Sequence, residues 1–244
     1  FKDPKYYTNR GLSWVLFDYR VLNEARDKSI PLFERLKFLS ITASNLDEFF
    51  MIRVASLKDM ENAGYTKKDI AGMTPTEQLK ALHVEIHELV DLQYSTYNRS
   101  LLPLLEKNGL HIVREHEQLT AEEATYVDQY FQENVYPVLT PMAVDSSRPF
   151  PLIRNKSLNI GAMVRKKNSD EELEFATVQV PSVLSRVVRI PSKGKACKII
   201  LLEEIIERNM DKLFLNYDIV CAHPFRIMRN ADLSIDEDLS LIHI

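Results

Sequence analysis

Apolar residues recur every three or four positions through residues 9–107, and this spacing constrains the fold more than any other feature of the chain. Such a period places apolar side chains on one face of a helix, as Leu12, Val15 and Leu16 illustrate at its start. Tight turns are scarce, because the 244 residues include only 6 Gly, whereas about 7% is usual. The sequence therefore predicts an all-α helical bundle that forms an N-terminal domain over residues 1–107.

Several local patterns predict where these helices begin. Pro31 suits the first turn of a second helix. Ser44, with Asp47 three residues later, predicts that a new helix is capped at Ser44 and runs to about Met60. The run Thr74–Glu77 offers a capping hydroxyl, a proline at the first helical position and an acid at the third. Two helices are thus expected to meet at Ser44, and a long one follows Thr74.

The pattern changes after Gly109, where helical and strand-like segments mix. A capping pattern at Thr120 and Glu123 predicts one further helix that ends before Pro137. A later helix is expected over residues 201–213. Strand-like runs, rich in β-branched residues, occur at residues 158–165, 173–180, 187–190 and 218–228. We therefore predict an α+β second domain over residues 108–244.

The net charge of the chain and its distribution limit the classes of partner that the chain can be expected to bind. The formal net charge is −4, which argues against a general nucleic-acid binder, because phosphate backbones require a basic face. Basic residues outnumber acidic ones over residues 145–229, and this local excess fits a small or polymeric anion better than duplex DNA. An ordinary solvated surface is the alternative, and the charges alone favour it.

The two cysteines and the hydropathy pattern indicate in which cellular compartment the chain is expected. Cys197 and Cys221 lie far apart in apolar surroundings, so we interpret both as free thiols of a reducing compartment. No apolar run approaches the roughly 18 residues of a membrane-spanning helix. The chain is therefore expected in the cytoplasm without a transmembrane segment, with peripheral membrane association left open.

The first candidate site lies at Asn45, at the expected junction of two helices. Free backbone N–H groups at a helix start can receive a polar ligand or an anion. An Asn side chain has both a donor and an acceptor, which suits the edge of an adenine-like base. The alternative is simple helix capping, which the residues alone favour. Asp47 and Glu48 are adjacent, so they point in different directions on a helix and form a poor acid–base pair.

The second candidate segment covers residues 139–159, where three prolines predict an extended, irregular path. Cationic side chains on a stiff loop suit phosphate oxygens or the carboxylates of a partner. A connecting loop with internal salt bridges is an equal alternative. The cationic residues concerned are Arg148, Arg154 and Lys156.

The remaining polar residues supply neither a catalytic group nor a metal site. His223 has no second His, Cys or Ser in a catalytic pattern, so a structural role is expected. His83 and His87 have the spacing of two metal ligands on a helix, yet no third ligand accompanies them. No glycine-rich phosphate loop occurs.

Four segments, in their order along the chain, resemble motifs of the polyphosphate kinase family. They are residues 6–22, residues 35–54 (RLKFLSITASNLDEFFMIRV), residues 139–159 and residues 223–233. The resemblance extends over about residues 6–238. It is to the type of enzyme that builds polyphosphate from the γ-phosphate of ATP through a phosphohistidine, in a reversible reaction.

The resemblance implies that the chain is the front part of such an enzyme. The family has a helical N-terminal domain, a head domain and two C-terminal domains of phospholipase D-like fold, and this chain ends before the last two. The phosphorylated histidine and the groups that bind Mg²⁺ lie in those C-terminal domains. No catalytic or metal-binding residue is therefore assigned here, and the chain alone is expected to be inactive.

The resemblance also implies roles for residues that are present. Asn45 is expected to contact the nucleotide, with the helical domain as a lid over the adenine. The head domain is expected to support a homodimer or higher homo-oligomer and to border the polyphosphate tunnel. The implied partners are ATP or ADP, inorganic polyphosphate and further copies of the chain, without nucleic acid. A stand-alone, non-catalytic assembly or polyphosphate-binding module is the alternative. The residues expected to contact polyphosphate or the other domains are Arg148, Arg154, Lys156, Arg226 and Arg229.

Overall fold

The structure, a computed structural model, describes residues 3–115, 118–144, 152–167, 173–191 and 196–230. The chain forms two compact units. Of the described residues, the first, the helical unit, contains those up to Leu105 together with residues 228–230, and the second, the mixed unit, contains those of Glu106–Ile227. The domain boundary predicted at residue 107 stays a prediction.

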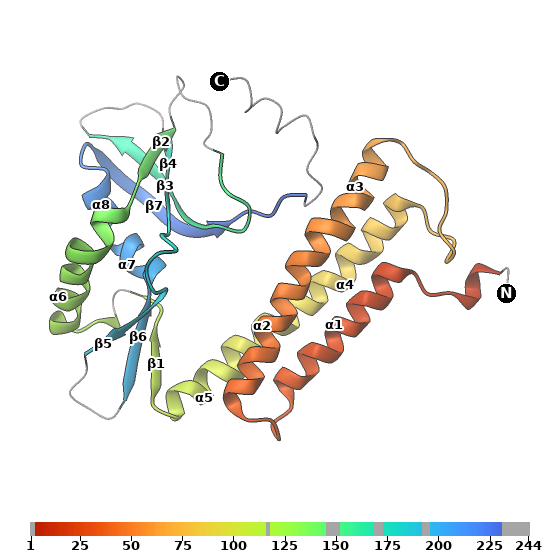
Figure 1. The fold of residues 1–244 in the computed structure, drawn as a ribbon, viewed down its shortest axis with the longest axis horizontal. Coiled ribbons are helices and arrows are strands. Elements are labelled where there is room, and N and C mark those ends of the chain that lie inside the picture. The colour runs from red at the N-terminus through yellow and green to blue at the C-terminus, as the bar shows by residue number, and fades with distance from the viewer. Residues whose placement is uncertain (1–2, 116–117, 145–151, 168–172, 192–195, 231–244) are drawn as a thin grey trace. The chain divides into compact units, whose positions relative to one another are not determined.

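The helical unit is built on four long helices: α1 (Arg10–Arg26), α2 (Leu32–Phe49), α3 (Ala55–Asn62) and α4 (Pro75–Thr96). Helix α1 packs against α2 and α4, and α3 packs against α4 (Figure 1). The apolar stripes of these helices meet in one core, since their 3.6-residue period directs them to the same side. Its fully buried members include Val15, Leu22, Leu57, Leu82 and Leu89.

The helix start predicted at Ser44 is wrong. Helix α2 runs without a break from Leu32 to Phe49, so Ser44 and Asn45 lie in its interior. A π-helical turn, Phe50–Val54, then leads directly into α3. No Gly or Pro interrupts this stretch, and the amide of Asn45 hydrogen-bonds to another helix instead of capping its own. No free backbone N–H groups therefore collect at residue 45.

The start predicted for α4 is confirmed as a capping box. The Thr74 hydroxyl accepts a hydrogen bond from the Glu77 amide at 3.3 Å, and the Glu77 carboxylate accepts one from the Thr74 amide at 2.7 Å. Each side chain thus satisfies a backbone donor that a helix start leaves free.

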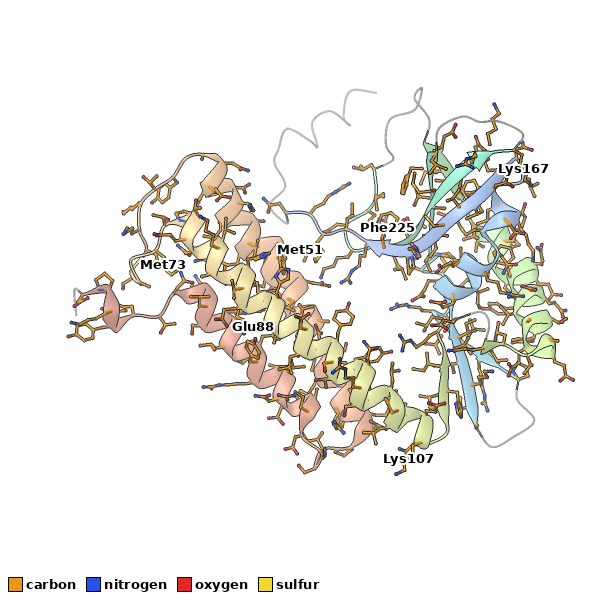
Figure 2. The ribbon with its side chains drawn as sticks, turned by 180° about the vertical axis from the view of Figure 1, so that it is seen from behind. Met51, Met73, Glu88, Lys107, Lys167 and Phe225 are labelled. Atoms are coloured by element: carbon orange, nitrogen blue, oxygen red, sulfur yellow. The ribbon has the colours of Figure 1, made fainter. Side chains whose placement is uncertain are left out.

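The end of α4 contains a second π-helical turn, Tyr97–Leu101. It comes just before Pro103, which donates no N–H to the helix. The short helix α5 (Leu102–Lys107) follows and ends at Lys107, which Figure 2 labels. Gly109 then adopts a φ of 83°, a left-handed conformation that suits glycine after a helix.

The mixed unit contains two sheets. One has the strand order β1 (Leu110–Val113), β6 (Cys197–Leu201), β5 (Val187–Ile190), with β1 and β6 parallel. The other is antiparallel, in the order β2 (Pro141–Val144), β4 (Glu174–Gln179), β3 (Leu158–Lys166), β7 (Tyr217–Arg226). Both sheets contribute to one core, together with helices α6 (Ala121–Tyr130), α7 (Leu202–Arg208) and α8 (Met210–Leu213).

The predicted fold class is confirmed: a helical N-terminal region is followed by a mixed α/β region. The four predicted strands form, whereas β1, β2 and β6 were not predicted. Strand β2 lies in the proline-rich segment that was expected to be irregular, and its Pro141 is the first residue of an edge strand, where a missing N–H is tolerated. Within the described ranges, every helix is too short or too polar to cross a lipid bilayer.

Replacing Thr74 by Ala should lower the free energy of unfolding of the helical unit by about 1 kcal/mol, because the first turn of α4 loses its capping hydroxyl. Urea unfolding followed by the fluorescence of Trp14, the chain's single Trp, measures this change in the helical unit. Thr74→Ser keeps the hydroxyl and serves as the matched control. Equal stability of the Ala and Ser variants would contradict the proposed contribution of the cap.

Candidate functional site

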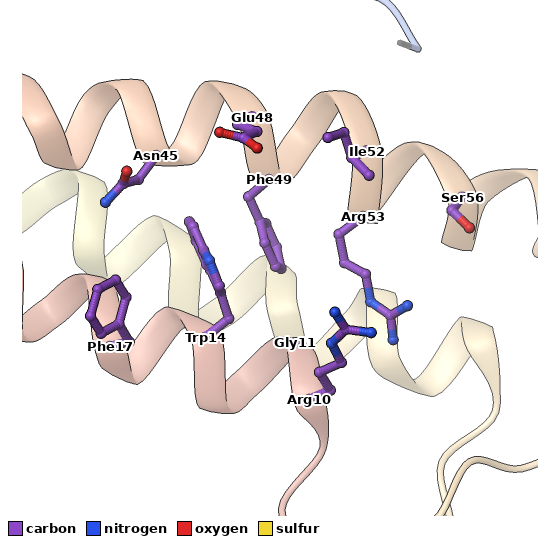
Figure 3. Close-up of a pocket in the computed structure, with 10 residues that line it drawn as sticks. All are labelled: Arg10, Gly11, Trp14, Phe17, Asn45, Glu48, Phe49, Ile52, Arg53 and Ser56. Carbon is purple, nitrogen blue, oxygen red and sulfur yellow. The ribbon is translucent and has the colours of Figure 1, made fainter. Parts of the chain in front are cut away.

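A cavity of about 370 Å³ opens on the helical unit between α1 and the stretch from α2 to α3 (Figure 3). This volume is within the range of small-molecule sites. Its lining mixes aromatic rings, one amide and charged groups. The lining residues are Arg10, Gly11, Trp14, Phe17, Asn45, Glu48, Phe49, Ile52, Arg53 and Ser56.

Helical periodicity brings these side chains together. On α1, the residues Arg10, Trp14 and Phe17 follow i, i+4, i+7 spacing and so share one face. On the facing stretch, Asn45 and Phe49 are four apart and lie opposite them. One face of α1 and one face of the stretch from α2 to α3 therefore form the two walls of the cavity.

Aromatic rings form the middle of the cavity. Trp14 stacks on Phe49 with 4.1 Å between ring centroids and 13° between ring planes. The exposed ring of Phe17 lies on the same wall as Trp14, on the side away from Phe49. Flat aromatic faces of this kind favour a planar ligand ring, since offset stacking adds to the burial of apolar surface.

Asn45 is held by a buried carboxylate. Its Nδ2 donates a hydrogen bond to Oδ1 of Asp18 at 2.9 Å. Asp18 has 0% exposure, and among the described residues its Oδ2 has no hydrogen-bond partner. Burial raises the pKa of Asp18 to about 6, although the bond from Asn45 lowers it in part. The sequence-predicted contact residue is thus in the cavity, with a partner that the sequence did not indicate.

The end of the cavity away from Asn45 is electropositive. Arg10 and Arg53 both line it, and neither forms an ion pair with any residue that the structure describes. The Nε of Arg53 is buried, and none of the described residues forms a hydrogen bond with it. Glu48 also lines the cavity and offsets part of this charge. Guanidinium groups suit oxyanions, so this end favours a negatively charged ligand group.

Sequence reasoning missed Arg10, Trp14, Phe17 and Arg53. The i, i+4, i+7 spacing on α1 could have placed the first three on one face. Nothing in that spacing says that this face meets the one carrying Asn45, because the pairing of two helices is a tertiary contact.

The other predicted residues lie elsewhere. Arg154 and Lys156 line a second cavity, in the mixed unit, of about 420 Å³. Lys156 has a φ of 62°, and its backbone N–H donates to the Ile227 carbonyl at 3.0 Å. Arg226 is the last residue of β7, and Arg229 follows that strand. Arg148 lies outside the described residues.

The histidines form no catalytic or metal constellation in the part of the chain that is described. His223 is exposed on β7, with its Nδ1 3.8 Å from Oε1 of Glu207. His83 and His87 pack ring against ring on α4, 4.1 Å between centroids. No three His, Cys, Asp or Glu side chains gather among the described residues in a way that could hold a metal ion. The Mg²⁺ that the family resemblance implies therefore does not fit these residues.

Comparisons with known proteins agree with the motifs. The family model described as "Polyphosphate kinase N-terminal domain" matches residues 7–113, and "Polyphosphate kinase middle domain" matches residues 122–242. A polyphosphate kinase of Lactiplantibacillus plantarum is 50% identical over 96% of this chain and 32% of its own length. One of Halalkalibacterium halodurans is 46% identical over 97% of this chain and 34% of its own length.

A solved structure of a polyphosphate kinase is also similar to this chain. The crystal structure of polyphosphate kinase from Porphyromonas gingivalis aligns with a TM-score of 0.82 and 27% identity, over 96% of this chain and 37% of that chain. The chain therefore spans about a third of the length of the curated relatives it matches.

Replacing Asp18 by Asn should change the pH dependence of stability. With a folded pKa of about 6 against an ordinary 3.8, folded Asp18 keeps a proton that the unfolded chain has already lost between these pH values. The wild type therefore loses stability as pH rises through this window, and the loss persists above it. The Asn variant carries no such titration, so it should gain on the order of 2 kcal/mol relative to wild type from pH 4 to pH 7.

Urea unfolding of both proteins at pH 4 and pH 7, followed by Trp14 fluorescence, measures this difference. Comparing the two pH values cancels any cost of the substitution that does not depend on pH. An unchanged difference between variant and wild type at the two pH values would contradict a raised pKa for Asp18.

Proposed function

The chain belongs to the polyphosphate kinase family, of which it comprises the N-terminal and middle domains, and from this premise we propose that its helical unit binds the base of ATP in the cavity at Asn45. In the complete enzyme, this unit would act as a lid over the nucleotide whose γ-phosphate is transferred to polyphosphate.

The observation that carries the proposal is the position of Asn45 beside exposed aromatic surface. A purine is planar, so it can lie against the rings of Phe17 and Trp14 while its polar edge meets the amide. An amide can hydrogen-bond to the edge of such a base, which apolar walls alone could not orient.

The electropositive end supports an anionic ligand. Arg10 and Arg53 lie at the far end of the same cavity, and neither forms an ion pair with a described residue, so their charges favour a nucleotide over a neutral nucleoside. Eight residues separate Asn45 from Arg53, which corresponds to about 12 Å along a helix. A ligand that reaches from one to the other is elongated, with an apolar ring at one end and an anion at the other.

In the mixed unit, we infer that basic residues contact polyphosphate or the domains that the family carries beyond this region. The second cavity supports this role, because Arg154, Lys156 and Arg186 all line it. The residues concerned are those predicted from the sequence: Arg148, Arg154, Lys156, Arg226 and, just beyond the mixed unit, Arg229. Self-association of the complete enzyme through this region belongs to the same proposal.

The chemistry of transfer is proposed to lie in the other two thirds of the enzyme. Phosphoryl transfer needs positioning of the reactants and neutralisation of charge more than covalent help. A lid that binds the base contributes positioning alone. Loss of the Asn45 amide should therefore weaken the use of ATP without abolishing the reaction.

ATP should bind to the chain itself and perturb Trp14. Since the chain has a single Trp, its NMR spectrum has a single indole N–H signal, which needs no further assignment. Titration with ATP should shift this signal, and Asn45→Ala should weaken the apparent affinity about fivefold to tenfold, as expected for one lost hydrogen bond. Asn62→Ala, an exposed position outside the cavity, is the matched control and should bind as wild type does. An indole signal that ATP leaves in place, or equal affinities of the Asn45→Ala and wild-type chains, would overturn the nucleotide site.

The chain alone should form no polyphosphate from ATP and should acquire no phosphohistidine. Incubation with ATP labelled at the γ-phosphate, followed by a test for acid-labile protein phosphate and for polymer, measures both. Label on a histidine of this chain would place part of the chemistry in the described domains and contradict the proposal.

A further inference from the structure

The side-chain amide of Asn45 has a donor end and an acceptor end, and the two ends would recognise different ligands. One of the two N–H groups at its donor end is engaged, because Nδ2 donates to Oδ1 of Asp18 at 2.9 Å. Figure 3 shows the amide nitrogen directed toward α1 and the oxygen directed away from that helix. An ionised carboxylate has only acceptors, so Asp18 can hold Asn45 by its nitrogen and not by its oxygen.

The fold gives no reason of its own for a carboxylate at this position. Asp18 has 0% exposure, and one of its two oxygens has no hydrogen-bond partner among the described residues. Val15 and Leu22, on the same helix, are also fully buried and apolar. Burying a charge with a single neutral partner destabilises a fold, so packing would favour a neutral residue here.

We propose that Asp18 is a positioning residue that engages the nitrogen of Asn45 and leaves its oxygen for the ligand, so that the site selects a purine with an amine at position 6, such as adenine. The inference rests on the proposed nucleotide site and adds its base specificity. It assigns to Asp18 a role that acts through Asn45, without contact between Asp18 and the ligand.

The chemistry of the bases explains the selection. At position 6, adenine carries an amine that donates a hydrogen bond, whereas hypoxanthine and guanine carry an oxygen that accepts one. With its nitrogen held by Asp18, Asn45 offers its oxygen, which pairs with the amine. If the Asn45 oxygen faces a base oxygen, two hydrogen-bond acceptors meet and neither has a donor. A site built for this hydrogen bond therefore binds such a base much more weakly.

Asp18→Asn is the decisive variant. An Asn side chain can accept from Nδ2 of Asn45 or donate to its Oδ1, so both orientations of the Asn45 amide keep a partner. The amide is then free to turn and to offer its donor to a base oxygen. The variant should therefore lose the discrimination between bases while it keeps its affinity for ATP within a few-fold.

The measurement compares ATP and ITP, which share ribose and phosphates and differ in the base alone. Titrations of the whole chain, read from the Trp14 indole signal, give the ratio of the two dissociation constants. Wild type should prefer ATP about tenfold or more, and Asp18→Asn should bring the ratio close to one. Asp91→Asn, the same exchange at an exposed site on α4, should leave the wild-type ratio unchanged.

The outcomes separate this inference from the nucleotide site itself. General damage to the fold weakens ATP and ITP alike, so it leaves the ratio in place. If Asn45→Ala weakens ATP binding and Asp18→Asn keeps the wild-type ratio, the role of Asp18 is overturned and the nucleotide site stands. If Asn45→Ala has no effect on ATP, the nucleotide site fails, and this inference fails with it.

One test of this inference requires only the wild-type chain. A wild-type chain that binds ITP as tightly as ATP would overturn the inference whether or not Asp18→Asn folds.

Discussion

The hydrogen bond between Asn45 and Asp18 is the interaction on which the rest of the candidate site depends. It joins residues 27 positions apart, the half-buried Asn45 on α2 and the fully buried Asp18 on α1. Beside it, the stacked rings of Trp14 and Phe49 join the same two helices. Polar and aromatic contacts thus fix which face of α1 meets which face of α2, and the cavity is the space that they leave between those faces.

The continuity of α2 is the second constraint. A helix break at Ser44 would have directed the following residues elsewhere, whereas the unbroken helix and the π-helical turn after it carry Asn45 and Arg53 along one wall. The π-helical turn lies inside the wall, in keeping with the frequent occurrence of such turns at functional sites. As a result, the amide of Asn45 and the cationic end of the cavity belong to one continuous stretch of backbone.

We propose that this chain contributes binding and that the rest of the complete enzyme contributes the chemistry of transfer. The chain spans about a third of the length of its curated relatives, and its described residues gather no metal-binding cluster. The helical unit has a cavity that we propose to bind a planar, anionic ligand, and the mixed unit has a second cavity with basic lining. In phosphoryl transfer, binding of this kind would supply the positioning that the reaction needs.

The sequence by itself determined the features that depend on interactions between residues close together in the chain. Helical periodicity, the capping boxes at Thr74 and Thr120, and the alternating strands β3, β4 and β5 depend on neighbours a few residues away. Motif order also identified the family. The tertiary structure alone decided the parallel pairing of β1 with β6, the strand at Pro141, and the partner of Asn45. Each of these joins residues distant in the chain, and local periodicity carries no information about which distant faces will meet. For that reason the family resemblance could point to Asn45 as an expected contact residue, while its buried partner Asp18 could not be found from the sequence.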